Sequence, residues 1–252
     1  MSEQVVSAQE QAMLALARAN VYNFLAAVYA APPTREMIAS LLEGTLAGAL
    51  AGFETVRSQL NDLEQELIGV DSSALAEALA VEHRRLFVGP GPRYVPPYQS
   101  VYTDRLTVQF CGMPHSGVQP RWKTVEGLLW GESTVAAARR YREAGVEPIG
   151  ELAGVPDHLA LELQFMQHLC SREAAAWHSG RSGEAGAWLR RQREFVAAHL
   201  APWVNAFAER VIVNALHPWY RAVAALTAEF VGDEAAVSAA ESAALEGTPC
   251  SA

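Results

Sequence analysis

The sequence predicts an all-α protein, a single helical-bundle domain of about nine or ten helices with a proline-rich loop near its middle. Three observations lead to this prediction. Apolar residues recur at the three-or-four spacing of helices over most of the chain. No stretch in the first half shows the alternation of a half-buried strand. With 252 residues, 50% of them hydrophobic, the chain can bury a substantial core.

The first helix is the clearest. Met13, Phe24 and Val28 belong to an apolar stripe at helical spacing, which ends before Pro32-Pro33. Shorter helices are expected at 35–43, 53–68 and 73–88. Each is followed by a glycine that can take the left-handed conformation at a helix end, namely Gly44, Gly69 and Gly89.

Residues 89–120 break the helical pattern. The segment Gly89–Tyr102 holds four of the 13 prolines, and proline cannot donate a backbone hydrogen bond, so we expect an ordered loop. The helical domain covers 1–232 with this loop inside it, and the small, acidic segment 233–252 is expected to be disordered. Helices are expected to resume at 122–130, 134–144, 156–177, 184–200, 203–216 and 218–231.

Charge and cysteine usage narrow the class of protein. The formal net charge is −9, and Lys123 is the one lysine among 19 basic residues, which argues against a nucleic-acid partner. Cys111, Cys170 and Cys250 are too scattered to suggest a disulfide framework or a zinc site. We expect neither a signal peptide nor a membrane-spanning helix, and therefore a cytoplasmic protein.

The common motifs of enzymes are missing from the sequence. It contains no phosphate-binding loop, no dinucleotide-binding glycine motif, no nucleophile elbow and no H-E-x-x-H. We therefore predict no catalytic residue, no cofactor and no metal. Two incomplete metal-ligand pairs, Cys111 with His115 and His158 with Glu162, are expected to be structural because no second pair completes either site.

Four short runs carry more specific information. Glu82–Pro90 (EHRRLFVGP) is a helix end followed by a tight turn, and Pro96–Tyr102 (PPYQSVY) comes soon after it. Leu129–Thr134 (LWGEST) precedes a helix. In Val155–Met166 (VPDHLALELQFM), the proline is expected to open a helix and to place Asp157 and His158 in its exposed first turn.

Together these runs resemble the TorD/DmsD/NarJ group of redox-enzyme maturation chaperones, in matching order over about residues 80–230. Relative to short members, the stretch 103–126 resembles an insertion. The resemblance implies an all-helical cytoplasmic chaperone that binds the twin-arginine leader of a molybdopterin-containing oxidoreductase. It also implies that the chaperone holds the leader until the cofactor is inserted and the enzyme can be exported. A homodimer is compatible with the sequence.

The resemblance implies a set of leader-binding residues. Such a leader offers two guanidinium groups and an apolar segment, so its receptor needs carboxylates beside aromatic side chains. Asp104 and Glu132 are candidates for supporting carboxylates, and Tyr94, Tyr102 and Trp130 for supporting aromatic groups. The residues carried over by position are Phe87, Tyr98, Gly131, Asp157 and His158.

Other interpretations of these residues remain at this stage. Phe87 and Trp130 can belong to the core, and Asp157 can simply complement a helix dipole. A second function is a helical enzyme in which His158 acts as a general base. A third is a nucleotide-responsive binding module.

Overall fold

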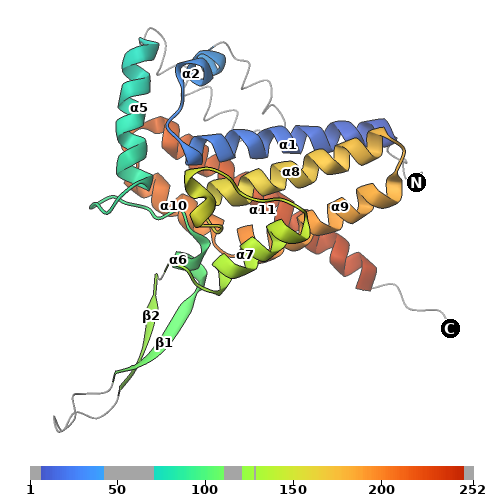
Figure 1. Cartoon of the computed structure of the whole chain (residues 1–252). Coiled ribbons are helices and arrows are strands. Elements are labelled where there is room, and N and C mark those ends of the chain that lie inside the picture. Colours follow the sequence, from blue (N-terminus) through green and yellow to red (C-terminus); the bar gives the residue numbers. More distant parts are fainter. Residues whose placement is uncertain (1–6, 43–70, 111–120, 128, 247–252) are drawn as a thin grey trace.

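The computed structural model describes residues 7–42, 71–110, 121–127 and 129–246. Over these residues the chain is a layered bundle of helices from which a two-stranded hairpin projects (Figure 1), and the predicted all-α fold class is confirmed. The expected helix at 53–68 lies outside the described residues. The elements are α1 (Ala8–Ala30), α2 (Arg35–Leu42), α5 (Ser72–Phe87), α6 (Gln99–Thr103), β1 (Arg105–Phe110), β2 (Arg121–Glu126), α7 (Glu132–Glu143), the 3-10 turn η1 (Glu151–Gly154), α8 (Leu159–His178), α9 (Ser182–Phe195), the π-helical turn η2 (Val196–Leu200), α10 (Val204–Asn214) and α11 (Pro218–Glu246).

Helix α1 begins at a complete capping box. The Ser7 hydroxyl accepts a hydrogen bond from the Glu10 backbone N–H at 3.2 Å, and the Glu10 carboxylate accepts one from the Ser7 N–H at 2.7 Å. Two N–H groups that would otherwise lack a partner at the helix start are thereby satisfied. The helix ends at Ala30, just before the proline pair, as the sequence predicts.

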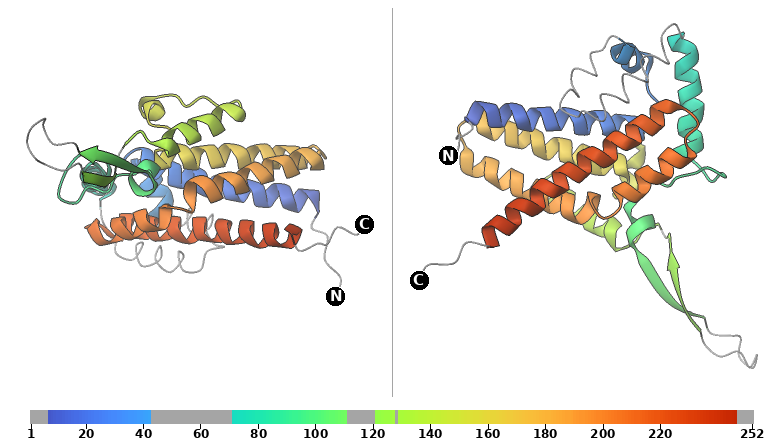
Figure 2. Two further views of the ribbon diagram at one scale, coloured as in Figure 1. Left: turned by 90° about the horizontal axis from the view of Figure 1, so that it is seen from below. Right: turned by 180° about the vertical axis from the view of Figure 1, so that it is seen from behind.

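Three helices form the central layer of the molecule. α1 and α8 run in opposite directions and pack against each other, and α9 lies on the other side of α8 (Figure 1). α11 crosses the back of this layer, while α7 lies on the opposite side from α11 (Figure 2). α10 packs against α11.

An aromatic cluster forms the core where α1, α5, α10 and α11 meet. The Phe87 ring lies 5.6 Å from Tyr29, 6.1 Å from Phe207 and 5.7 Å from Tyr220 between centroids. Phe87 is 3% exposed, and removing a ring from such a site typically costs about 3–5 kcal/mol. The structure thus places Phe87 inside the core and not on a binding surface.

Two glycines end helices in the way that the sequence suggests. Gly145 after α7 and Gly180 after α8 have φ of 72° and 69°. After α8, the Gly180 N–H donates to Trp177 O and the Arg181 N–H to Ala176 O, which is the Schellman pattern.

The expectation that Gly89 takes the left-handed conformation is wrong. α5 ends at Phe87, its C-cap Val88 has a negative φ, and Gly89 is not among the positive-φ residues of the described chain. The Leu86 carbonyl instead accepts a hydrogen bond from the Val95 N–H at 2.8 Å. The returning loop thus satisfies a carbonyl that a Schellman turn would otherwise satisfy.

The stretch 103–126 contains a hairpin that the sequence analysis did not predict. β1 and β2 pair in antiparallel register from Arg105 opposite Glu126 to Phe110 opposite Arg121, so the expected helix at 122–130 is wrong. The expected loop at 89–120 is also corrected, because it contains α6 and β1. β1 alternates Leu, Val and Phe with polar residues, and both strands are rich in β-branched and aromatic types, which favour strands.

The prediction that the segment 233–252 is disordered is wrong for residues 233–246. α11 continues through residues 233–246, well past the predicted end at 231. This stretch is rich in alanine, the strongest helix former, and it extends a helix whose first half is already packed, so no new nucleation is needed. Residues 247–252 lie outside the described chain.

None of the helices in the described ranges has both the length and the apolar character needed to span a membrane.

The two glycine environments give a test of the fold. Gly180→Ala is expected to lower the free energy of unfolding by roughly 1 kcal/mol, because a Cβ disfavours its left-handed backbone. Gly186→Ala, inside α9 with an ordinary 3.8 Å contact for the new Cβ, is expected to raise it by about 0.5–1 kcal/mol. Urea unfolding of both variants measures the difference. Equal effects would contradict the helix-end assignment.

Candidate functional site

The segment before α6 lies directly against the start of α8. Tyr98 and His158 form an isolated antiparallel bridge. The Gln99 N–H donates to Asp157 O at 3.0 Å, and the Leu159 N–H donates to Pro97 O at 2.9 Å. The proline-rich run and the Pro-Asp-His run, far apart in sequence, therefore meet at one place.

Asp157 holds these two segments together from the inside. Its Oδ2 accepts a hydrogen bond from the Ser100 N–H at 2.9 Å and so caps the start of α6. The side chain is fully buried, and its Oδ1 has no hydrogen-bond partner among the described residues. The expectation of an exposed Asp157 in the first turn of a helix is wrong, because α8 starts only at Leu159 and the 96–98 segment covers its beginning.

His158 is the N-cap of α8 and is also buried, with 3% of its surface exposed. Its Nδ1 accepts a hydrogen bond from the Ala160 N–H at 3.1 Å, which requires that nitrogen to be unprotonated. Burial, with a smaller effect from His83, lowers the pKa of His158 from 6.5 to about 4. The ring is therefore neutral at neutral pH, and the nitrogen needed by a general base is already engaged.

Glu162, one turn into α8, was considered from the sequence as half of a metal site or as a partner that orients His158, and not as a leader-binding residue. It is fully buried, and neither carboxyl oxygen has a hydrogen-bond partner within the described chain. Burial, and then the nearby charge of Asp157, raise the pKa of Glu162 well above its ordinary value. The neighbouring Trp203 indole offsets only part of this rise, and its N–H donates to the His199 carbonyl and not to Glu162. Among the described residues, no three potential ligands gather as a metal site would require. The pair Cys111–His115 lies outside those residues.

Gln99 and His199 tie this region to η2. The Gln99 amide donates to Ala198 O at 3.0 Å, and its Oε1 lies 2.9 Å from His199 Nδ1. The His199 ring stacks on Phe195 with centroids 4.5 Å apart. Burial, followed by the charges of Arg140 and Arg139, lowers the pKa of His199 to about 4. Gln99 and His199 are 100 residues apart, and no local sequence pattern predicts that they pair, so neither was among the predicted residues.

Asp104 caps a second helix at the far end of α6. Its Oδ2 accepts hydrogen bonds from the Ser133 N–H at 3.0 Å and the Ser133 hydroxyl at 2.9 Å, in the first turn of α7. Gly131 lies so close that a Cβ there would be 1.8 Å from Asp104 Oδ2. Gly131 is thus required for the close approach of Asp104, while its φ of −94° is open to any residue.

The predicted aromatic residues divide into exposed and packed side chains. Tyr94 and Tyr98 are partly buried neighbours, and burial raises the pKa of Tyr94 to about 12. Tyr102 lies 5.2 Å from the Trp203 ring and carries the Arg210 guanidinium 5.4 Å above its own ring. Trp130 is 65% exposed and has a φ of 68°, which is unusual for a bulky residue.

Two groups of predicted residues therefore emerge. Tyr98, Asp157 and His158 meet at the start of α8, and Asp104 meets Gly131 at the start of α7, where Trp130 and the exposed Glu132 flank the glycine. α6 connects the groups because Asp157 caps its beginning and Asp104 follows its end. Phe87 belongs to neither group.

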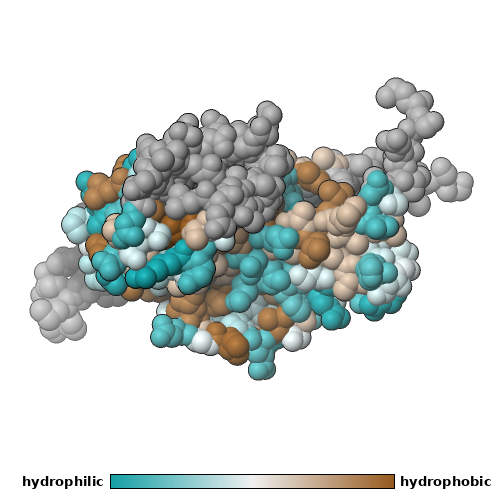
Figure 3. Space-filling view, turned by 90° about the horizontal axis from the view of Figure 1, so that it is seen from above, coloured by the Kyte–Doolittle hydropathy of each residue, from teal (hydrophilic) through white to brown (hydrophobic). Residues whose placement is uncertain are grey.

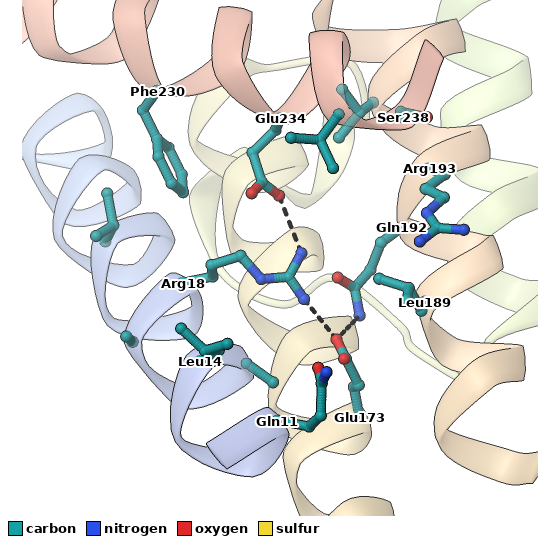
Figure 4. A pocket seen from close by; sticks show the side chains of 15 residues that line it. Gln11, Leu14, Arg18, Glu173, Leu189, Gln192, Arg193, Phe230, Glu234 and Ser238 are labelled. Atoms are coloured by element: carbon teal, nitrogen blue, oxygen red, sulfur yellow. Dashed lines mark hydrogen bonds and ion pairs between the residues drawn. The ribbon is translucent and has the colours of Figure 1, made fainter. Parts of the chain in front are cut away.

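A separate cavity of about 490 Å³ lies between α1, α8, α9 and α11 (Figure 4). On its floor the Arg18 guanidinium bridges Glu173 at 2.5 Å and Glu234 at 3.2 Å, and the Gln192 amide also donates to Glu173 at 2.8 Å. Cys170 lies behind this network and donates to Gln192. Burial raises the pKa of its thiol to about 12, although Arg18 acts in the opposite direction.

The outer surface near this cavity carries several apolar side chains. Met13, Leu14 and Leu16 in the first half of α1 are more than half exposed. Figure 3 shows apolar residues gathered on the face formed by that part of the helix. Leu14 and the exposed Val237 line the cavity.

Comparison with known proteins identifies the family. The model for the nitrate reductase delta subunit matches residues 52–209. The chain belongs to the nitrate reductase delta subunit family. Similar proteins include the chaperone protein TorD of Vibrio cholerae serotype O1, 27% identical over 227 residues (88% of this chain and 92% of that protein), and TorD of Colwellia psychrerythraea, 24% identical over 236 residues (89% and 93%). The Tat proofreading chaperone DmsD of Salmonella paratyphi A is 29% identical over 184 residues (68% and 72%).

The resemblance to the TorD/DmsD/NarJ group is thus confirmed, and the protein is a chaperone of this group and not an enzyme. The geometry agrees with that conclusion at His158, whose Nδ1 serves as a helix cap. The nucleotide-responsive alternative remains without a supporting observation in the described residues.

The contact between Gly131 and Asp104 gives a test of the α7 end of the site. Gly131→Ala is expected to lower the chaperone's stability by about 1–3 kcal/mol, because the new methyl group overlaps the carboxylate. Asp104→Ala alone is expected to cost about 1 kcal/mol through the lost cap. The double variant is expected to be more stable than the sum of the two costs predicts, since the overlap is gone. Strict additivity in thermal unfolding would contradict the contact.

The buried histidines make stability depend on pH. Because the pKa of His158 falls from 6.5 to about 4 on folding, its contribution is present above pH 6.5 and is lost as the pH falls toward 4. The loss reaches at most about 3 kcal/mol. His158→Asn keeps a side-chain acceptor for the cap but cannot titrate, so its melting temperature is expected to fall less between pH 7 and 4. The control His178→Gln, at an exposed position, is expected to follow the wild type.

Proposed function

We propose that this chaperone binds the twin-arginine leader of a molybdopterin-containing oxidoreductase in the cytoplasm. It holds the leader until the cofactor is inserted and the enzyme can be exported. One relative is named a Tat proofreading chaperone, and it aligns with 68% of this chain. The observation that carries the proposal is the arrangement at the start of α8, where the partly exposed Tyr98 pairs with His158, next to the buried Asp157 and one turn before the buried carboxyl group of Glu162.

This arrangement suits the chemistry of the leader. Guanidinium groups bind carboxylates through paired hydrogen bonds and stack on aromatic faces, and the apolar segment of a leader needs an apolar surface. Tyr94, Tyr98 and Trp130 supply partly or largely exposed rings, and Glu132 supplies an exposed carboxylate. The protein's net charge of −9 favours the approach of a basic peptide.

The predicted site residues have different roles in this proposal. Tyr98 and the supporting Tyr94, Trp130 and Glu132 contact the leader, because their side chains reach the surface. His158 and Gly131 position the segments that carry these groups.

Three further residues act from inside. Asp104 fixes the start of α7, and Phe87 stabilises the core behind the site. Tyr102, packed on Trp203 under Arg210, anchors α6 to α10.

Leader titration by calorimetry tests the proposal. Wild-type chaperone is expected to bind a peptide with the twin-arginine motif and its apolar stretch, and more weakly at higher salt because part of the attraction is charge. Trp130→Ala is expected to weaken binding about tenfold, since an exposed ring that stacks on a guanidinium or apolar side chain is lost.

Trp188→Ala provides the matched control. Trp188 is a partly buried tryptophan on α9 that stacks with Arg172 and Arg191, away from the proposed site. Its loss is expected to leave leader affinity within about twofold, well below 1 kcal/mol. Absence of binding by the wild type at tens of micromolar leader would refute the proposal, and equal effects of the two variants would remove Trp130 from the site.

A further inference from the structure

The start of α8 contains a group of buried oxygen atoms that lack hydrogen-bond donors. Both carboxyl oxygens of Glu162, Oδ1 of Asp157 and the Ser100 hydroxyl have no partner in the described part of the chain. All three side chains are fully buried. Buried polar atoms are nearly always satisfied in folded proteins, so these oxygens need a water, a ligand or a proton to complete them.

The neighbouring groups do not complete the site. The Tyr141 hydroxyl, from α7, donates to Pro156 O at 2.7 Å. The Trp203 N–H donates to His199 O at 2.6 Å, and His158 Nδ1 already accepts from the Ala160 N–H. Asp157 and Glu162 are therefore two neighbouring acidic groups that have no cation beside them among the described residues. The nearby His199 is a neutral ring.

Such a pair cannot carry two negative charges in a dry interior, because each buried charge needs a partner. In this structure Glu162 is the neutral member, since its two oxygens lack donors while Asp157 accepts from the Ser100 N–H. A guanidinium has a planar fork of N–H donors and no acceptor, which matches a set of unpaired carboxyl oxygens.

We propose that Asp157 and Glu162 together receive one leader guanidinium, and that Glu162 releases its proton to solvent as that guanidinium enters between them. This inference rests on the proposed leader-binding function. The O–H bond of the Glu162 carboxyl group breaks and the proton passes to the buffer. The pair carries one negative charge before binding, and pair plus guanidinium carry one negative charge afterwards, so the net charge buried at the site is unchanged.

Entry requires the 97–100 segment to move away from α8. Three hydrogen bonds hold it there: Gln99 N–H to Asp157 O, Leu159 N–H to Pro97 O, and Ser100 N–H to Asp157 Oδ2. The entering guanidinium supplies donors to Asp157 in place of the Ser100 N–H, which offsets part of the cost of opening.

The test is calorimetric titration of the full chain with the leader peptide at pH 7, in phosphate and in Tris, whose heats of protonation differ. Release of about one proton per leader is expected for the wild type, seen as a buffer-dependent heat. Affinity is expected to strengthen by up to about tenfold per pH unit between pH 6 and 8. The buried His158, His83 and His199 cannot supply this proton, because their pKa values of about 4 leave them neutral at pH 7.

Two variants test whether Glu162, and not another carboxyl group, releases the proton. Glu162→Gln is expected to abolish the buffer dependence and to weaken binding about tenfold or more, because an amide cannot become the second carboxylate. Glu229→Gln removes a partly buried carboxylate on α11 and is expected to release protons as the wild type does. Infrared difference spectra of the wild type supply a measurement that needs no variant. The absorption of a protonated carboxyl group is expected to disappear on leader binding.

The outcomes distinguish the two proposals. Leader binding with the same heat in both buffers, and no change in the carboxyl absorption, would overturn the proton-release inference while leaving the leader-binding function intact. Buffer-dependent heat that persists in Glu162→Gln would assign the proton to another group and also overturn it. Absence of leader binding would overturn both.

Discussion

The hydrogen bond from the Ser100 N–H to Asp157 is the contact on which the arrangement of the site depends. From this contact, a circuit of interactions runs through α6 and α7 and returns to the residue next to Asp157. Asp157 caps α6, Asp104 at the end of α6 caps α7 through Ser133, and Tyr141 on α7 donates to the carbonyl of Pro156, next to Asp157. At the starts of α6 and α7, a backbone N–H group donates to a carboxylate from outside the helix, namely Asp157 for α6 and Asp104 for α7. Displacement of one member therefore alters the support of the next.

This circuit explains which parts of the structure could be predicted from the sequence. α1, α5 and α8 follow from apolar spacing and from prolines and glycines, which act within a few residues. Asp157 and Ser100 are 57 residues apart, and Asp104 and Ser133 are 29 apart. No local pattern announces either pairing. The sequence therefore singled out Asp157 but wrongly predicted an exposed side chain.

The errors at the hairpin and at α11 have different causes. Lys123, Thr124 and Val125 fall in a short run that can also be read as helix, and their strand conformation depends on pairing with β1. In α11, a low content of large apolar residues suggested disorder for 233–246. An alanine-rich extension of a packed helix needs little further burial. Glu162 was not among the predicted leader-binding residues, because its distinguishing property is the lack of hydrogen-bond donors around it, which only the packed structure reveals.

The network around Arg18 has a consequence for the chemistry of Cys170. This thiol is buried behind the Arg18–Glu173 pair, donates a hydrogen bond to Gln192, and has its pKa raised to about 12. Oxidation and alkylation proceed through the thiolate, which is almost absent at neutral pH under these conditions. The Cys170 thiol is therefore protected from reaction with peroxides and disulfides, and it can remain reduced while more exposed thiols are oxidised.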